Sequence, residues 1–159
     1  MGSRGSSSGK GKKKGSRVSN TAQTVDIAAI ESAIRSKGGE GTFIRSEVPA
    51  LVRSSDDNGL EIHSEKGYAT IVDGVPVFIQ GSSKNGYSYN IYGMTASREP
   101  MKTLSEAKDT AAIKTLVERA KSANNGIDTM KKVFEAANNE GGITLEEYTR
   151  IVRRNRKQA

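Results

Sequence analysis

The feature of this sequence that most constrains its fold is a pair of turn signals in the middle of the chain. Asp73-Gly74 separates two runs rich in β-branched and aromatic residues, YATIV and VPVFI, and Asn85-Gly86 precedes a third such run, YSYNIY. Asp-Gly and Asn-Gly suit a two-residue hairpin turn because both central residues need a positive φ. The pattern therefore predicts two successive hairpins and a three-stranded antiparallel sheet.

A helical pattern precedes this sheet. Ile27, Ile30 and Ile34 recur at spacings of three and four, and a Gly-Gly pair follows as a C-terminal stop. This spacing predicts a helix over residues 25–37.

The segment SEVPALVRSS lies between that helix and the first predicted strand. Ser46 is a good N-cap, and Pro49 would occupy the first helical turn, where its missing N–H is tolerated. We interpret the segment as a second, short helix.

Two later helices begin with the same motif. TLSE at 103–106 and TLEE at 144–147 both fit a capping box, in which Thr accepts a bond from the third amide and Glu reaches back. The apolar positions of the first of these helices are Leu104, Ala107, Ile113, Leu116, Val117 and Ala120. A further amphipathic helix between the two motifs is predicted from Met130, Val133, Phe134 and Ala137.

This order of elements predicts an α+β fold, with an N-terminal helix, a three-stranded antiparallel sheet, a helix and a C-terminal helical pair. We divide the chain into a disordered basic arm at 1–23, an α+β domain at 24–123 and a C-terminal helical hairpin with a basic end at 124–159. The arm is assigned as disordered because its Gly, Ser and Lys residues cannot bury apolar surface.

The net charge of +7 is unevenly distributed. Residues 1–17 hold six of the 25 Lys and Arg residues and residues 150–159 hold five, and neither segment contains an acidic residue. The part between them carries the other 14 basic residues and all 18 acidic ones, a formal charge near −4. An acidic body with two basic ends indicates what kind of partner the chain binds rather than how it folds.

The basic ends supply the candidate contacts to nucleic acid. In the arm these are Lys10, Lys12, Lys13, Lys14 and Arg17. In the last helix they are Arg150, Arg153, Arg154 and Lys157, which share one face at i, i+3, i+4 and i+7. The alternative is a solvated helix end, because cations are also favoured there by the helix dipole. Nothing in either segment reads bases, so we expect weak sequence selectivity.

Catalytic and metal-dependent classes are disfavoured. His63 is the only histidine and Cys is absent, which excludes histidine clusters and cysteine-based zinc sites. Glu61, His63 and Glu65 alternate in LEIHSE, so we expect them on one outward strand face rather than in an acid–base site. The loop from Ala136 to Glu147 resembles a degenerate EF-hand, but it has alanine where calcium needs its first carboxylate. We expect no catalytic residue, no metal and no cofactor.

Four tyrosines fall in the predicted sheet, and they could either stack on bases or pack in the core. They are Tyr68, Tyr87, Tyr89 and Tyr92. Alternation along the third strand predicts Tyr87 and Tyr89 on one face and Tyr92 on the other. We favour packing over base stacking.

The first helix, the three strands and the helix LSEAKDTAAIKTL resemble the double-stranded RNA-binding domain in the order of their elements. Members of that family carry a Lys-Lys-x-Ala-Lys element in the last helix, which implies RNA binding. Ala107 and Lys108 match it, whereas Leu104 and Ser105 replace the two leading lysines. The opening MGSRGSSSGKG is similar to the starts of many small phage and prophage proteins, which implies a viral or mobile-element context.

We therefore expect a non-enzymatic protein that binds nucleic acid, or a nucleoprotein complex, through its arm and last helix. The alternative is a phage structural or anti-defence protein whose acidic body contacts a protein partner. No run approaches 18 apolar residues, so we expect no membrane partner. The expected location is the cytoplasm, that of the bacterial host if the chain is phage-encoded, or the virion. The choice between DNA and RNA and the oligomeric state are left open.

Overall fold

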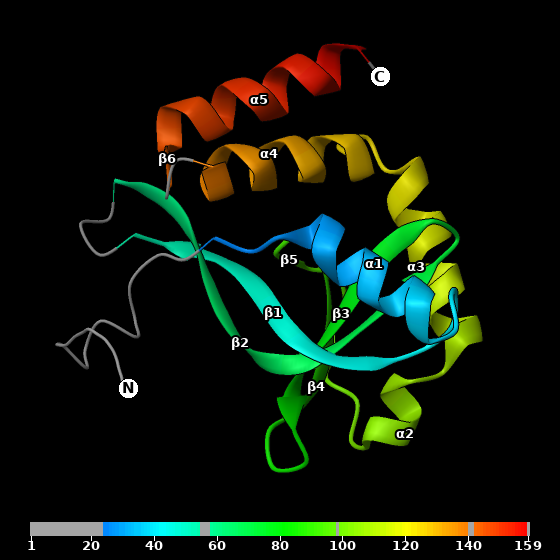
Figure 1. Ribbon diagram of the computed structural model, residues 1–159. Helices are drawn as coiled ribbons and strands as arrows, with labels where there is room; N and C mark the ends of the chain where they lie inside the picture. The colour runs from blue at the N-terminus through cyan, green and yellow to red at the C-terminus, as the bar shows by residue number, and fades with distance from the viewer. Residues whose placement is uncertain (1–23, 55–57, 98, 140–141, 159) are drawn as a thin grey trace, which may run out of the picture.

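The computed structural model describes residues 24–54, 58–97, 99–139 and 142–158, with side chains up to Arg154 (Figure 1). Its elements are α1 (Ile27–Lys37), β1 (Ile44–Arg53), β2 (Gly59–Val72), β3 (Val75–Ser82), β4 (Gly86–Ile91), β5 (Met94–Thr95), α2 (Leu104–Ala107), α3 (Thr110–Ser122), α4 (Ile127–Asn139), β6 (Ile143–Thr144) and α5 (Leu145–Gln158). The described strands form one antiparallel sheet in the order β1-β2-β3-β4-β5, and β6 pairs with the start of β2. The fold is therefore α+β, as predicted.

The sheet has six strands in the described residues, not three: the short strands β5 and β6 are added, and residues 46–53 of the segment SEVPALVRSS form a strand and not a helix. These residues belong to β1, which pairs with β2 over ten residues, from Ile44 opposite Ala69 to Arg53 opposite Leu60. β1 lies at the edge of the sheet, and an edge strand tolerates Pro49 because its missing N–H can face away from the neighbouring strand. Pairing with a distant segment outweighs the local helix signals.

Of the two predicted two-residue hairpin turns, the one at Asp73-Gly74 is confirmed. Asp73 and Gly74 have φ of 56° and 80°, and Val72 pairs with Val75, so the β2–β3 turn has two residues, both with positive φ. The β3–β4 turn differs, because Ser82 pairs with Gly86 and leaves a loop of three residues between them. Gly86 begins β4 with φ 88°, a conformation that glycine adopts without strain.

The helix predicted from TLSE is divided into two. α2 is a single turn capped by Thr103, which accepts a bond from the Glu106 amide at 3.0 Å. α3 then starts afresh at Asp109, whose carboxylate accepts bonds from the amides of Ala111 and Ala112 at 3.0 and 3.3 Å. Asp109 is therefore a second N-cap that was not recognised in the sequence. It starts α3 directly after α2, so the predicted single helix is divided at this residue.

The other helical predictions are confirmed. α1 begins after Asp26, whose carboxylate accepts a bond from Ala29 N at 3.0 Å, and it ends at Gly38. α4 and α5 form the C-terminal pair, and Thr144 caps α5 by accepting a bond from Glu147 N at 3.0 Å. In the part of the chain that the structure describes, no helix has the length and apolar content that crossing a membrane requires.

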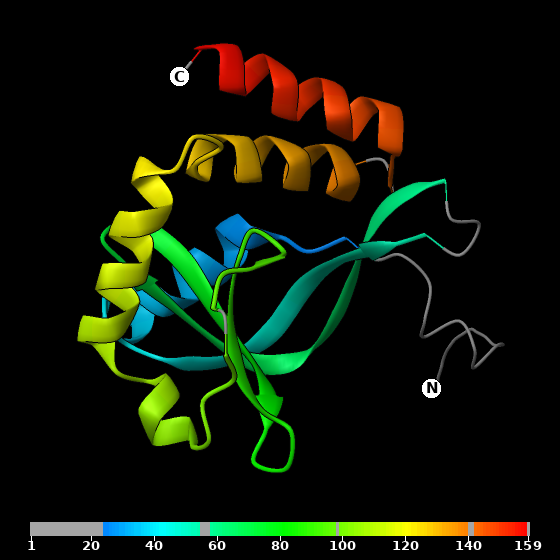
Figure 2. The same ribbon diagram turned by 180° about the vertical axis from the view of Figure 1, so that it is seen from behind.

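The sheet is covered on both faces. α1 lies in front of the sheet in Figure 1 and behind it in Figure 2, and α3 does the opposite. The α1 side buries Ile34, Val48, Ala69, Ile71 and Phe78. The other side is larger, and its buried residues include Val77, Ile79, Tyr89, Ile91, Ile113, Val117, Val133 and Phe134. This cluster contains residues from both sides of the predicted domain boundary at residue 123, and that boundary stays a prediction.

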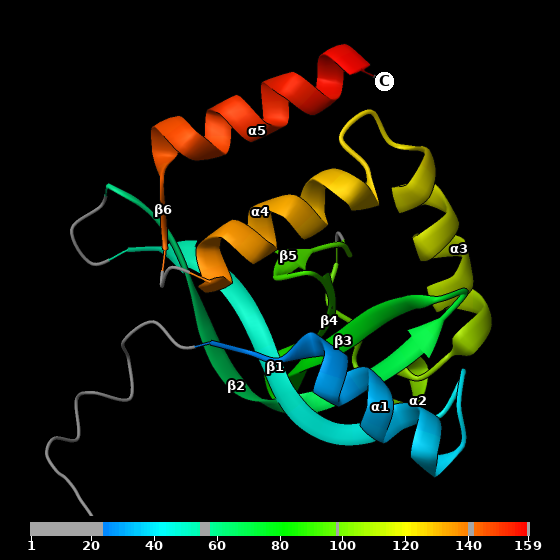
Figure 3. The same cartoon turned by 45° about the horizontal axis from the view of Figure 1, so that its top comes forward.

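The sheet is curled so that its edge strand β1 meets the turn between β4 and β5. Leu51 N donates to Gly93 O at 2.9 Å. The buried Asn90 side chain donates to Pro49 O and accepts a bond from Gly93 N at 2.7 Å. The Asn90 side chain and the Leu51–Gly93 backbone bond together join β1 to the β4–β5 turn, and Figure 3 shows the curled sheet with α5 above it.

Candidate nucleic-acid interface

The predicted contact residues of the arm lie outside the described residues. They are Lys10, Lys12, Lys13, Lys14 and Arg17. The candidate contacts that the structure describes lie on the last helix, α5.

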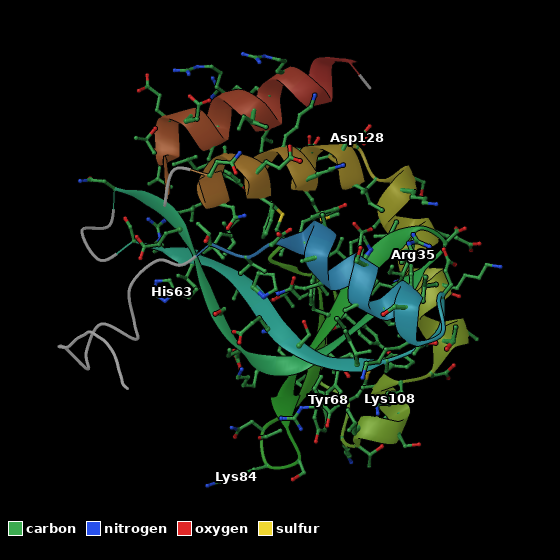
Figure 4. All side chains as sticks on the ribbon, in the orientation of Figure 1. Arg35, His63, Tyr68, Lys84, Lys108 and Asp128 are labelled. Atoms are coloured by element: carbon green, nitrogen blue, oxygen red, sulfur yellow. The ribbon has the colours of Figure 1, made fainter. Side chains whose placement is uncertain are left out.

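α5 presents the basic residues whose side chains the structure describes, Arg150, Arg153 and Arg154, on the side away from the body. Tyr148 and Ile151 pack against the larger core, and Val152 is half-buried. The opposite side extends outward from the molecule, with nitrogen-tipped side chains along its edge (Figure 4). The exposed residues of the predicted stripe are Arg150, Arg153 and Arg154, whereas Lys157 is described only as part of the helix backbone. The three arginines line a surface hollow of about 690 Å³, together with Leu145, Glu146 and Thr149.

The three arginines differ in how far they are already neutralised. Arg150 Nη1 lies 2.6 Å from Glu147 Oε1, and its Nη2 lies 3.9 Å from Glu146 Oε2. For Arg153 and Arg154, no carboxylate of the described residues lies within 4.0 Å. An incoming phosphate would therefore meet two uncompensated guanidinium groups beside one that is already paired.

A second group of cations, not predicted from the sequence, gathers around Tyr68. The guanidinium carbon of Arg45 lies 5.1 Å from the centre of the Tyr68 ring, and Arg45 Nη1 donates to the Tyr68 hydroxyl at 3.3 Å. Lys108 Nζ lies 4.7 Å from the same ring centre and 5.7 Å from that of Phe43. Tyr68 and Lys108 are neighbours at the lower end of the molecule in Figure 4. We call Phe43, Arg45, Tyr68 and Lys108 the aromatic–basic cluster.

The sheet and the α2–α3 junction hold this cluster in place. Arg45 of β1 is directly opposite Tyr68 of β2. Lys108 follows the fully buried Ala107, whose carbonyl accepts a bond from the hydroxyl of Tyr89 at 3.0 Å. Lys108 N also donates to Leu104 O at 2.9 Å. The lysine therefore has an anchored backbone and a side chain that can reach the sheet.

The other predicted tyrosines are mostly part of the core. Tyr89 and Tyr92 are buried, and burial raises the pKa of both hydroxyl groups. Tyr92 is not on the face predicted for it, because β4 ends at Ile91 and Tyr92 adopts φ 50° in the following turn. Tyr87 is half-buried and packs against the core.

The candidate acid–base group of the sequence forms a structural pair. His63 Nε2 lies 2.8 Å from Glu61 Oε1. The side chains of His63 and Glu61 are only 30% and 16% exposed, so they are more buried than expected for residues on an outward strand face. Glu65 is exposed. Within residues 24–54, 58–97, 99–139 and 142–158, no group of three His, Asp or Glu residues could hold a metal ion.

An acidic hollow of about 590 Å³ lies between the start of α1 and α4. Asp26, Glu31 and Glu135 line it, and Lys131 is the one cation among the described residues that do so. Tyr92 also lines this hollow, and its pKa is raised first by burial and then by the negative charge of Glu31 and Glu135. The hollow would attract a positively charged ligand.

Comparison of the chain with protein-family models, with curated proteins and with solved structures found no significant match in any of the three.

Proposed function

We propose that this protein acts by binding nucleic acid, without catalysis, through the exposed arginines of α5 together with the basic arm. The observation that carries the proposal is the pair Arg153 and Arg154, which line one hollow beside Arg150 and have no carboxylate partner among the described residues. Arginine is well suited to phosphate because its planar guanidinium can donate two parallel hydrogen bonds. We place this activity in the cytoplasm or in a virion.

The contacts would be to the phosphate backbone and therefore largely independent of sequence. Each Lys or Arg that neutralises a phosphate of a duplex releases about 0.9 counterion, so affinity falls with salt in proportion to the number of contacts. The other residues that line the hollow of Arg153 and Arg154 are Leu145, Glu146, Thr149 and Arg150. They do not form an extended surface that could contact the edges of several bases. We expect similar affinities for different sequences of the same length.

The test is the salt dependence of binding to labelled duplexes and single strands of DNA and RNA, followed by fluorescence anisotropy. In Arg153→Gln/Arg154→Gln, the slope of log affinity against log salt should become shallower by about 1.8 on a duplex. The matched control is Arg35→Gln/Arg119→Gln, which removes the same charge from two other exposed helical arginines. Equal effects of the two double variants would show that only net charge matters and would contradict the proposed interface.

The contribution of the arm can be tested separately. If it acts through charge, changing Lys10, Lys12, Lys13 and Lys14 together to Gln should weaken binding, whereas shuffling residues 2–17 should not. Loss of binding on shuffling, with all charges retained, would instead indicate a specifically recognised segment.

The acidic hollow between α1 and α4 favours a second candidate function, contact with a basic protein partner. Charge complementarity with Asp26, Glu31 and Glu135 would steer such a partner. The discriminating variant is Glu31→Gln/Glu135→Gln. It should leave nucleic-acid binding intact, or strengthen it slightly by reducing negative charge, and it should abolish binding of a basic partner.

A further inference from the structure

We propose that the aromatic–basic cluster is a second phosphate-binding site, which takes the backbone of a single-stranded nucleic acid between Arg45 and Lys108. The inference rests on the proposed function for its ligand, but its residues lie on other elements. α5 is at the top of the molecule in Figures 1 and 2, and α2, which precedes Lys108, is at the bottom. The two surfaces therefore contact different parts of a ligand.

The first reason is that two positive charges converge without a compensating carboxylate. Both cations lie within about 5 Å of the Tyr68 ring centre, so they are no more than about 10 Å apart. Neither has a carboxylate within 4.0 Å in the described part of the chain. Glu47, the next acidic residue along β1, is occupied by Lys66 at 2.7 Å and by Ser64 at 3.0 Å. The cluster therefore presents two cations that form no ion pair with a carboxylate of the described residues.

The second reason is the geometry of the donors. The Tyr68 hydroxyl accepts a bond from Arg45, which leaves its own O–H available to donate. Arg45 retains further N–H donors, and Lys108 has three. Guanidinium, phenol and ammonium groups around one ring provide the donor set that a phosphate oxygen accepts.

The third reason concerns the kind of nucleic acid. Phe43, directly before β1, and Tyr68 of β2 are half-buried aromatic residues next to the cations. Single strands bind where aromatic rings and cations lie side by side, because their unstacked bases can contact rings while phosphates contact charges. A duplex hides its bases and would gain only the charge contacts.

The test compares Arg45→Gln/Lys108→Gln with the matched control Arg119→Gln/Lys132→Gln, which removes one Arg and one Lys charge from exposed positions on α3 and α4. On a single-stranded oligonucleotide the first variant should bind about tenfold more weakly at about 0.1 M salt, with a log–log slope shallower by about 1.4, since each contact to a single strand contributes about 0.7. Its loss on a duplex should be smaller. Equal losses in the two variants, or a greater loss on the duplex, would overturn the proposal.

Two further measurements separate this site from folding defects and from the α5 interface. Tyr68→Phe keeps the ring and removes only the hydroxyl, and we expect it to weaken single-strand binding two- to threefold with unchanged thermal stability. NMR titration of the whole chain with tripolyphosphate should shift the amide signals of Arg45, Tyr68 and Lys108 at the cluster. If these signals shift but no nucleic acid binds, the proposed function fails and the phosphate site stands. If nucleic acid binds through α5 and these signals do not move, the site is refuted and the proposed function stands.

Discussion

Asn90 offers the sharpest test of the fold, because one side chain fastens the two ends of the curled sheet. Its side chain is 1% exposed. The amide nitrogen donates to Pro49 O of β1 and to Gln80 Oε1 at 3.0 Å, and the amide oxygen accepts a bond from Gly93 N at 2.7 Å. Asn90→Ala removes all three bonds while leaving the strand backbone intact.

The expected cost follows from which partners remain without a bond. Gln80 is half-buried and can turn to water, whereas Pro49 and Gly93 are buried. A buried polar group left unsatisfied costs about 1–3 kcal/mol, so two such groups predict a loss of about 2–6 kcal/mol in the free energy of unfolding. That is a large part of the total of about 5–15 kcal/mol typical of a domain.

The measurement is urea unfolding monitored by circular dichroism, with Ser88→Ala as the matched control. Ser88 is on the same strand and, two residues away, on the same face, and it should cost less than about 0.5 kcal/mol. A loss below about 1 kcal/mol in Asn90→Ala, with an unchanged denaturant slope, would show that water satisfies both groups and that Asn90 does not fasten the sheet.

Three further predictions concern stability. Thr70→Val should raise the free energy of unfolding by about 1 kcal/mol in the same urea assay, because the fully buried Thr70 hydroxyl has no hydrogen-bond partner among the described residues; a loss would mean that the hydroxyl is satisfied. Asp109→Ala should cost about 1 kcal/mol by removing the N-cap of α3, and Asp109→Asn should restore most of it. The pKa of Glu47 is lowered, first by the hydrogen bond that Lys66 donates to its carboxylate and then by the one from Ser64. The stability that these bonds contribute is therefore fully present above the unfolded-state pKa of Glu47. It is lost as the pH falls through the lower, folded-state pKa. Because the carboxylate is exposed the effect is small, and Glu47→Gln should make stability less dependent on pH between about pH 6 and about pH 3; an unchanged profile would contradict this.

Local chemistry explains which parts of the fold could be predicted from the sequence. The Asp73-Gly74 turn and the caps at Thr103 and Thr144 were predicted correctly, because each depends on residues within a few positions of one another. β1 was not, because its strand conformation comes from pairing with β2 and its own letters suit a helix start equally well. The break between α2 and α3 had a signal that was missed, namely an N-cap residue, Asp109, inside an apolar helical pattern.

The α5 stripe and the aromatic–basic cluster also differ in whether they could be predicted from the sequence. The stripe on α5 could be found by spacing, because one helix carries all its residues. The aromatic–basic cluster could not, because Arg45, Tyr68 and Lys108 come from three segments that only the register of β1 with β2 and the anchoring of α2 bring together. Once β1 is recognised as a strand, its pairing places Arg45 opposite Tyr68, and that is the earliest point at which the cluster could be inferred.

Simple electrostatics indicates how the two surfaces would act together. At the upper limit of their separation, about 10 Å, the two unit charges repel by about 0.4 kcal/mol in water, an amount that is small beside the stability of a domain. A phosphate about 5 Å from each cation would gain about 0.8 kcal/mol per contact in water, which makes the cluster a weak site when it acts alone. A nucleic acid already held by Arg153 and Arg154 would meet the cluster at a high effective concentration, and weak contacts then add to the affinity. R45Q/K108Q alone should therefore reduce the affinity for a long single strand by a larger factor than the affinity for short strands, because a short strand reaches only one surface and can still bind at the intact α5 surface. Equal factors on the two lengths would show that the two surfaces never engage one strand together.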